Sequence, residues 1–371
     1  MRILQVAPYY PPYQGGQEYY VKRLVESLRK RGHSVLVLTS DYPTKADYTQ
    51  KGIYKIPVFM RPFRNPIYKN IVGVISLIKQ MAKWADIVHT HNEHSMISML
   101  AGSVIRSTPI VTTVHGKLRF GKRIPDLLET IYTHTIGQYV LNKARVVIAL
   151  TPDEKWRLIN LGVKKSKVVQ IPNGIDLDFL NLTEITNTQY NISPKNHNIL
   201  FVGALIIRKG VDVLIRAFDI VAERDDKAHL YIVGNGEDAL KIKRLADSSP
   251  YSDRIHFLGR VSQDKLKYLY NVAEIFVLPS RSEGLPTVII EALAYGKKIV
   301  SSDLPSVRTI FKDFVRISPL NEEDFARAIL SEIQAKDNRK RERLEFVKKY
   351  LDWEKIVDRI EKVYESILEA P

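Results

Sequence analysis

Short apolar runs alternate with amphipathic segments along the first 171 residues. The runs have the length of buried parallel strands and are Ile3–Ala7, Val35–Thr39, Asp86–His91, Ile110–His115, Val146–Leu150 and Val168–Ile171. Between the first two, Val21, Leu24, Val25 and Leu28 recur at helical spacing, and Gly32 is a helix stop. This strand–helix–strand order predicts an open, mostly parallel sheet whose ligand sites lie at the carboxyl ends of its strands.

The same pattern restarts after a polar stretch, Asp176–Asn198, which is typical of an interdomain connection. The second set of predicted strands is Ile199–Gly203, Leu230–Gly234, Ile255–Gly259, Ile275–Pro279 and Ile299–Ser302, and its helices lie near Val211–Glu223, Asp264–Tyr270 and Thr287–Tyr295. The last stretch, Trp353–Leu368, has an apolar helical stripe that must be buried. We therefore predict an α/β chain of two Rossmann-like domains facing one another. The first is residues 1–175 with the C-terminal helix, 353–371, returning to it; the second is 176–352.

Composition excludes several classes. The chain is 45% hydrophobic and 26% charged, as globular proteins are, and it has no cysteine, which excludes disulfides, thiolate metal sites and thiol nucleophiles. The first ten residues resemble a buried strand rather than a signal peptide, and Ile71–Ile78 is far shorter than the roughly 20 residues that cross a bilayer. We expect a cytoplasmic protein that is not integral to a membrane.

The positive charge is concentrated in the first half. Residues 1–170 hold 26 Lys and Arg against 10 Asp and Glu, whereas residues 171–371 hold 30 against 31. Such a surplus attracts anionic lipid surfaces, phosphorylated acceptors or nucleic acid, or serves only solubility. Ile67, Ile71, Val74, Ile75 and Ile78 form an apolar stripe with lysines near its ends, which is either a core helix or a segment that rests on an anionic membrane.

In the second domain, the segment from Pro279 to Gly296 carries the strongest chemical signal. Glu283 and Gly284 follow a predicted strand, and Pro286 suits the first turn of a helix whose free N–H groups favour a phosphate. Glu291 lies among apolar neighbours, so it needs a partner, either a ligand hydroxyl such as a ribose or an internal Lys or Arg.

A pair of cations is placed to meet the same phosphate. Arg208 and Lys209 end the loop after the strand Ile199–Gly203, directly before a glycine and a helix. Cations there can reach a diphosphate, although a surface pair at a loop end is common.

These residues belong to an ordered set of motifs. The set comprises Gly15-Gly16, Thr113-Val114-His115-Gly116, Ile171-Pro172-Asn173-Gly174-Ile175-Asp176, Arg208-Lys209-Gly210, Ile232-Val233-Gly234-Asn235-Gly236-Glu237, and Glu283 with Glu291. In this order the chain resembles the GT-B glycosyltransferases of family 4 over nearly its whole length.

The resemblance implies a retaining transfer of a hexose from a UDP- or GDP-sugar. It implies that the catalytic residues are His115, Arg208, Lys209 and Glu283, with the cations neutralising the departing diphosphate. The implied donor-binding residues are Gly16, Gly234, Arg260, Val261, Gly284, Leu285 and Glu291. Glu291 would bind the ribose, and Arg260 with Val261 would lie at the base. One departure is Ala204, where many relatives have arginine, and Arg208 is the candidate substitute.

The first domain would hold the acceptor. Tyr9, Tyr10, Gly15 and Gly16 form the loop after the first strand, where the glycines allow close approach of a sugar or phosphate and the tyrosines either stack on a sugar ring or pack internally. By resemblance, His115 would lie near the transferred sugar; otherwise it is a strand-end histidine bonded to backbone.

No cofactor is expected beyond the donor. His89, His91 and His94 suggest a metal site, but no carboxylate motif accompanies them and the family normally needs no metal. The expected acceptor is a glycan, a glycolipid or a lipid-linked molecule on an anionic membrane surface, and nucleic acid is not expected. The alternatives are a polyanion-binding protein without turnover, a transferase for a small soluble acceptor, and a phosphorylase or epimerase on the same fold.

Overall fold

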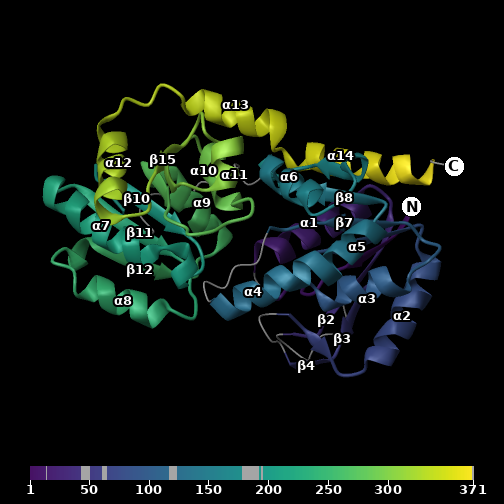
Figure 1. Cartoon of the computed structure of the whole chain (residues 1–371). Helices are drawn as coiled ribbons and strands as arrows, with labels where there is room; N and C mark the ends of the chain where they lie inside the picture. The colour runs from purple at the N-terminus through teal and green to yellow at the C-terminus, as the bar shows by residue number, and fades with distance from the viewer. Residues whose placement is uncertain are drawn as a thin grey trace. The chain divides into compact units, whose positions relative to one another are not determined.

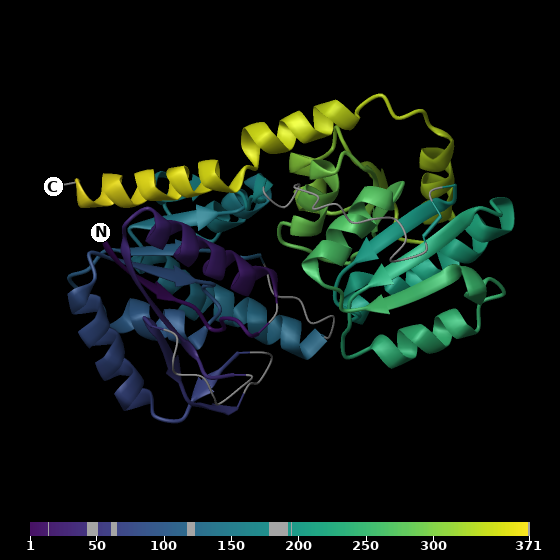
Figure 2. The same cartoon turned by 180° about the vertical axis from the view of Figure 1, so that it is seen from behind.

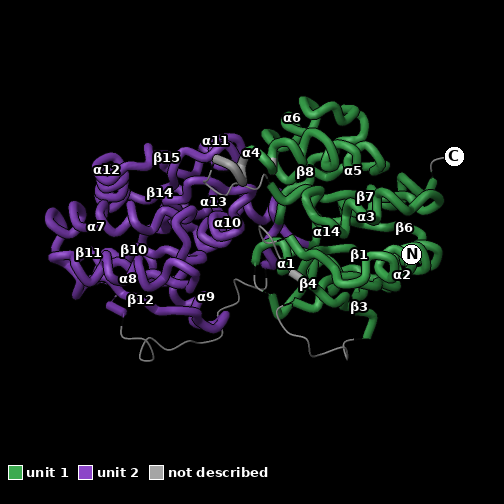
Figure 3. The backbone as a smooth tube through the Cα atoms, turned by 60° about the horizontal axis from the view of Figure 1, so that its bottom comes forward, with its two compact units in different colours: residues 1–173, 354–371 green, residues 174–353 purple. Residues whose placement is uncertain are grey.

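The computed structural model describes residues 1–13, 15–42, 51–60, 65–116, 123–177, 192–193 and 195–369. The chain divides into two compact units, residues 1–173 with 354–371 and residues 174–353, coloured separately in Figure 3. The sequence analysis places the division between 175 and 176, two residues away, and assigns the C-terminal helix from residue 353 to the first domain.

The first unit is built on a parallel sheet of order β3-β2-β1-β6-β7-β8-β9. Its strands are β1 (Arg2–Val6), β2 (Ser34–Ser40), β3 (Ile53–Ile56), β6 (Ile87–His91), β7 (Ile110–Thr113), β8 (Val146–Ala149) and β9 (Val168–Gln170). A separate antiparallel pair consists of β4 (Val58–Met60) and β5 (Ile67–Tyr68). The six predicted strands are confirmed with ends shifted by one or two residues, while β3, β4 and β5 were not predicted.

Helices cover this sheet, and Figure 1 labels the α-helices among them. They are α1 (Gly16–Lys30), α2 (Ile71–Trp84), α3 (Met96–Val104), α4 (Arg123–Tyr132), the π-helical turn η2 (Thr133–Gly137), α5 (Gln138–Lys143), α6 (Pro152–Asn160), the 3₁₀ turn η3 (Lys165–Lys167) and α14 (Trp353–Leu368). The first helix stops as predicted, because Gly32 has φ +85 and ends the helical path after Lys30.

The apolar stripe near residue 70 is mainly a core element. Val74 and Ile78 of α2 are 3% and 0% exposed and pack against the sheet, whereas Ile67 lies in β5 and is not part of the helix. Ile71 at the first position of α2 is 40% exposed. The interpretation of this stripe as a membrane segment is therefore wrong for its central residues, which are already buried in protein.

The second unit repeats the architecture with a parallel sheet of order β12-β11-β10-β13-β14-β15. Its strands are β10 (His197–Val202), β11 (Ala228–Val233), β12 (Ile255–Gly259), β13 (Ile275–Leu278), β14 (Lys298–Ser302) and β15 (Arg316–Ser318). Its helices are η6 (Ile207–Lys209), α7 (Val211–Arg224), α8 (Ala239–Asp247), η7 (Ser252–Arg254), α9 (Gln263–Val272), α10 (Thr287–Ala294), α11 (Pro305–Ile310), α12 (Glu322–Gln334) and α13 (Lys340–Tyr350). The two Rossmann-like sheets predicted from the sequence are confirmed.

The predicted connection, Asp176–Asn198, ends earlier than expected, since His197 and Asn198 already belong to β10. Residues 178–191 and 194 of this stretch lie outside the described residues.

The C-terminal helix α14 packs on the first unit, as Figure 2 shows in yellow beside the purple N-terminal elements. Ile356 and Ile360 of its apolar stripe are 1% and 0% exposed. At its polar edge, Arg31 at the end of α1 bonds to Glu354, Asp358 and Glu361. Burial of the stripe thus carries the attachment, at about 1.5–3 kcal/mol for each fully buried side chain.

Candidate active site

The strand order of the second unit predicts where a ligand site lies. The order reverses between β10 and β13, the strands at the centre of the sheet, and the loops after those strands diverge at this point. Arg208 and Lys209 come from the loop after β10, while Glu283 comes from the loop after β13. The predicted cations and the predicted carboxylate therefore share the switch point of the sheet.

A left-handed glycine brings the two loops into contact. Gly210 has φ +68, and a Cβ atom there would lie 1.8 Å from the carbonyl oxygen of Pro279 at the end of β13. Beside it, the backbone N–H of Arg281 donates to the carbonyl of Arg208 at 2.8 Å, and the guanidinium of Arg281 pairs with Asp212 at 2.8 Å. Only glycine fits this approach of the two backbones.

Glu283 lies at the centre of a charged cluster. Its Oε1 atom accepts from Lys209 Nζ at 2.6 Å and from Ser280 Oγ at 2.6 Å, and its Oε2 atom lies 3.6 Å from Arg208 Nη1. The glutamate side chain is 9% exposed and Lys209 is 17% exposed. Burial would raise the pKa of Glu283, but the charges of Lys209 and Arg208 outweigh burial, so the pKa lies below its ordinary value. The site holds an ionised carboxylate and two cations at neutral pH.

The chain then enters α10 with donors available. Gly284 and Leu285 precede the helix, and within the described residues their backbone N–H groups have no hydrogen-bond partner. Pro286 is the N-cap and supplies no side-chain acceptor. Free N–H groups at the positive end of a helix, next to two cations, form a site suited to phosphate.

Glu291 has a partner that sequence reasoning did not supply. Its Oε2 atom accepts from the hydroxyl of Tyr270, in α9, at 2.7 Å, and Tyr295 stacks on Tyr270 with ring centroids 5.5 Å apart. Burial and the Glu291 carboxylate both raise the pKa of Tyr270, so its hydroxyl stays protonated and donates. The phenol of Tyr270 therefore helps to hold this carboxylate in place.

The remaining predicted donor residues lie at the same edge of the sheet. Gly234, after β11, has φ +134, and a Cβ there would lie 1.8 Å from the carbonyl oxygen of Gly203. Arg260 and Val261 follow β12; Arg260 is exposed and Val261 half-buried. Ala204, at the departure from the family pattern, is exposed. Its candidate substitute, Arg208, bonds to the carbonyl of Ser282 at 2.5 Å.

In the first unit, the tyrosines of the loop after β1 are packed internally. Tyr9 and Tyr10 are each 5% exposed, and Tyr9 stacks on Tyr13 at 4.4 Å, which is the internal-packing alternative. Gly15 is the N-cap of α1, and the Glu18 carboxylate occupies the space where a Cβ of Gly15 would lie, at 2.2 Å. The Glu18 carboxylate thus lies at the start of α1, whereas Gly16 has open space where its Cβ would be.

His115 follows β7, which ends at Thr113 rather than at His115 as predicted. Its Nε2 atom lies 3.2 Å from Nδ1 of His91, so its partner is a side chain and not backbone. Burial lowers the pKa of His115 to about 4, which leaves the imidazole neutral at pH 7. The next residue, Gly116, donates its N–H to Glu154 at 2.8 Å.

The histidines that suggested a metal site have other partners. His89 and His91 are fully buried and hydrogen-bonded, and His94 pairs with Glu93 at 3.1 Å. Among the residues that the structure describes, no group of three or more potential metal-binding side chains is arranged around one point.

Comparison with known proteins connects this geometry to a family. Residues 14–179 match the model of Glycosyltransferase Family 4, and residues 183–349 match that of Glycosyl transferases group 1. The chain belongs to the GT-B glycosyltransferases. The two matches correspond to the two units, so the enzyme class applies to the whole chain.

The relatives of this glycosyltransferase cover it from end to end. It is 27% identical to a phosphatidyl-myo-inositol mannosyltransferase of Mycobacterium tuberculosis, over 99% of the chain and 97% of that protein. It is 22% identical to one subunit of the phosphatidylinositol N-acetylglucosaminyltransferase of Arabidopsis thaliana, over 100% of the chain and 83% of that protein. Both relatives are named for lipid acceptors.

Solved structures share the fold of the glycosyltransferase. A sucrose-phosphate synthase of Thermosynechococcus elongatus superposes with a TM-score of 0.82 at 20% identity, covering 100% of both chains. Anabaena HepE in complex with UDP superposes with a TM-score of 0.80 at 17% identity, covering 99% of this chain and 100% of that one. These likenesses concern the fold.

Two groups of residues that hydrogen-bond to the predicted site residues or their neighbours were missed from the sequence. Tyr270 and Ser280 support the glutamates from neighbouring elements, and nothing in their spacing marks them. Glu154 carried a signal, since Thr151 and Glu154 have the spacing of a capping box. Thr151 Oγ1 does accept from the N–H of Glu154, but the carboxylate instead accepts from the N–H groups of Leu150 and Gly116.

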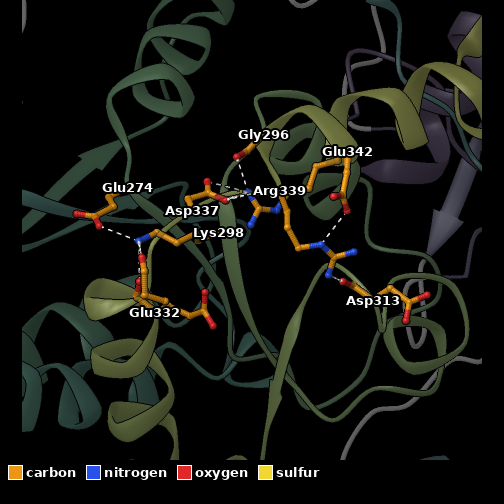
Figure 4. A network of polar contacts seen from close by, with 10 residues as sticks. Glu274, Gly296, Lys298, Asp313, Glu332, Asp337, Arg339 and Glu342 are labelled. Carbon is orange, nitrogen blue, oxygen red and sulfur yellow. Dashed lines mark hydrogen bonds and ion pairs between the residues drawn. The ribbon is translucent and has the colours of Figure 1, made fainter.

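A cavity of about 730 Å³ in the second unit of the glycosyltransferase lies away from these loops. Lys298 and Arg316, the first residues of β14 and β15, line it, so it is at the amino ends of the strands. Figure 4 shows its polar network, in which Lys298 bonds to Glu274 at 3.0 Å. Arg343 bonds to Asp337 at 2.8 Å and 2.9 Å. In these two pairs a carboxylate neutralises the charge of Lys298 and of Arg343, and the pairs connect neighbouring elements of the second unit.

Proposed function

We propose that the enzyme transfers a hexose from a UDP- or GDP-sugar to a hydroxyl of a lipid-linked or glycan acceptor, with retention of anomeric configuration and without a metal ion. The observation that carries the proposal is the cluster of Arg208, Lys209 and Glu283 at the switch point of the second sheet, next to the available N–H groups that precede α10.

The diphosphate of the donor would lie against the two cations. Lys209 and Arg208 supply positive charge, and the N–H groups of Gly284 and Leu285 supply hydrogen bonds at a helix start. As the bond between the anomeric carbon and the phosphate oxygen breaks, charge develops on the diphosphate, and these groups stabilise it more in the transition state than in the ground state. The same cations neutralise the charge of the departing diphosphate, as a metal ion does in other enzymes.

The carboxylates would orient the rest of the donor. Glu283 is ionised and would accept from hydroxyls of the transferred sugar, while Glu291, oriented by Tyr270, would accept from the ribose. Gly234, Arg260 and Val261 at the adjoining strand ends would surround the base. Because Glu283 is engaged by two cations, it is a poor nucleophile, which favours direct attack by the acceptor from the face that the diphosphate leaves.

In that step the acceptor oxygen forms the new bond to the anomeric carbon, and its proton passes to the departing diphosphate. No covalent glycosyl-enzyme intermediate is required. His115, neutral and close to the end of β7, would hold the transferred sugar from the first unit.

A membrane-bound acceptor is supported by the first unit. Residues 1–170 carry 26 Lys and Arg against 10 Asp and Glu. On α4, Leu127, Leu128 and Ile131 are 59%, 51% and 53% exposed. In the described part of the chain, no helix is long and apolar enough to span a bilayer. We propose peripheral binding in which these apolar side chains enter an anionic interface that the basic surface attracts.

Vesicle binding tests this proposal. The purified protein is expected to bind vesicles rich in phosphatidylglycerol at low salt, and L128D with I131D is expected to weaken binding about tenfold or more, because apolar burial is lost and negative charge is added. The matched control is L240D, which changes a leucine of α8 that is 77% exposed. If the parent protein ignores anionic vesicles, the acceptor would have to be sought among soluble molecules.

A thermal-shift panel of nucleotide sugars tests the donor site. A ligand at a hundredfold excess over its Kd adds about 2.7 kcal/mol to the free energy of unfolding, which raises Tm by roughly 5 °C or more for a unit of this size. We expect a UDP- or GDP-hexose to give this shift in the parent and a smaller one in K209M. A shift with polyphosphate alone, and with no nucleotide sugar, would favour the polyanion-binding alternative.

A further inference from the structure

A row of polar side chains is buried in the face of the first sheet that α14 covers. Gln5 of β1, His89 and His91 of β6, and Thr113 of β7 are each 0% exposed. The register places Gln5 opposite His89 and His91 opposite Thr113. Buried polar groups are costly unless they are hydrogen-bonded, so the partners of each are informative.

The hydrogen bonds of this row continue to His115, and the donors and acceptors along it can be assigned. Gln5 Oε1, which can only accept, lies 2.7 Å from Nε2 of His91, so His91 must carry its proton on Nε2. His91 is neutral because burial lowers its pKa well below the ordinary value. Its Nδ1 atom is then an acceptor, and it lies 3.2 Å from Nε2 of His115. His115 must therefore donate through Nε2, which leaves its own Nδ1 unprotonated.

The other end of the row is set by the C-terminal helix. Gln5 Nε2 donates to the hydroxyl of Tyr364 at 3.4 Å, and the amide oxygen is the atom that faces His91. The Tyr364 hydroxyl in turn lies 2.6 Å from Nδ1 of His89, whose Nε2 lies 2.7 Å from Oγ1 of Thr113. Tyr364 is 0% exposed. Each donor in this chain meets an acceptor in one consistent direction from His115 to α14.

We propose that Tyr364 and Gln5 are positioning residues that hold His115 in its Nε2–H tautomer, so that its Nδ1 accepts a hydrogen bond from a hydroxyl of the transferred sugar. The sugar contact rests on the function proposed above, whereas the tautomer does not. The final helix of the chain thereby takes part in the reaction through hydrogen bonds, although Tyr364 is 249 residues from His115 in sequence.

The tautomer can be read directly. In the full-length protein labelled with ¹⁵N-histidine, long-range ¹H–¹⁵N correlation spectra distinguish protonated from unprotonated ring nitrogens, and H115N assigns the His115 signals. We expect Nε2 of His115 to be protonated and Nδ1 unprotonated at pH 7 in the absence of any ligand. A proton on Nδ1 in the parent would overturn the proposal.

Two variants test the positioning. Y364F and Q5M are expected to give averaged His115 nitrogen signals and to lower kcat about tenfold, as the loss of one neutral hydrogen bond does. The matched control is Y68F, since Tyr68 is also buried, at 2% exposure, but lies in the core on the other face of the sheet. It should leave both readouts unchanged.

This experiment can contradict the positioning proposal and the proposed glycosyl transfer independently of each other. If Y364F and Q5M leave the His115 signals as in the parent, the positioning role is wrong, whatever the enzyme transfers. If the signals change as expected but no nucleotide sugar is consumed by the parent, the tautomer chain stands and the sugar contact falls with the proposed function. Should one variant not fold, the parent spectrum and the other variant still decide.

Discussion

Replacing Glu283 with glutamine is expected to lower kcat about 100-fold or more while the second unit stays folded. The substitution keeps the shape of the side chain but removes the charge that Lys209 and Arg208 face at 2.6 Å and 3.6 Å. The cations then lose their fixed partner, and the sugar hydroxyls lose a charged acceptor, both of which matter most in the transition state. Steady-state kinetics with the best donor from the thermal-shift panel measure the loss.

The control for E283Q is E322Q. Glu322 pairs with Arg216 at 3.1 Å on the surface of the same unit, where both side chains are well exposed. An exposed ion pair contributes little to stability, so E322Q should keep its kcat and its Tm. A kcat for E283Q within about threefold of the parent would contradict the catalytic role of Glu283, given that one charged hydrogen bond contributes more than this.

Replacing Gly210 with alanine is expected to abolish donor binding. The new Cβ would lie 1.8 Å from the carbonyl oxygen of Pro279, and both partners are backbone, so the loop after β10 must move away from the end of β13. A non-glycine residue at φ +68 costs about 1 kcal/mol by itself, and the displaced loop separates Lys209 from Glu283. Calorimetric titration of the donor should show no measurable heat, and Tm should fall.

The control variant Gly32→Ala has the backbone strain of a positive φ without the steric clash expected in Gly210→Ala. Gly32 has φ +85 but open space where its Cβ would be. This variant should lose about 1 kcal/mol of stability and bind the donor as the parent does. Equal donor affinity in G210A and the parent would show that the contact between the two loops is not needed for the site.

Sequence patterning was sufficient for the central strands of the parallel sheets because these strands are buried on both faces and form continuous apolar runs. The runs around Leu4 and Leu230 are of this kind, and both strands were found within two residues of their ends. β3 and β15 were missed because they lie at sheet edges, where Lys55 and Arg316 interrupt the apolar pattern.

The sequence predicted those site residues whose positions follow from the order of strands, loops and helices along the chain. Arg208 and Lys209 were predicted to meet the phosphate at the helix start after Glu283, because each segment follows a predicted strand and stands before a helix. Tyr270 and Tyr364 were not predicted, since each acts through a long-range hydrogen bond from a helix whose position depends on packing. The sequence did not decide whether Tyr9 packs internally or stacks on a sugar, because a tyrosine has no local signal that separates packing from binding.

Transfer from labelled donors tests the central claim most directly. UDP- and GDP-hexoses carrying a radiolabelled sugar are incubated with the enzyme, vesicles containing phosphatidylinositol and other anionic lipids, and EDTA, and both nucleotide diphosphate release and label in the lipid are followed. We predict that one donor yields equal amounts of the two products and that K209M yields neither at a measurable rate. Failure of every donor to react, or an undiminished rate in K209M, would contradict the assignment of the donor site.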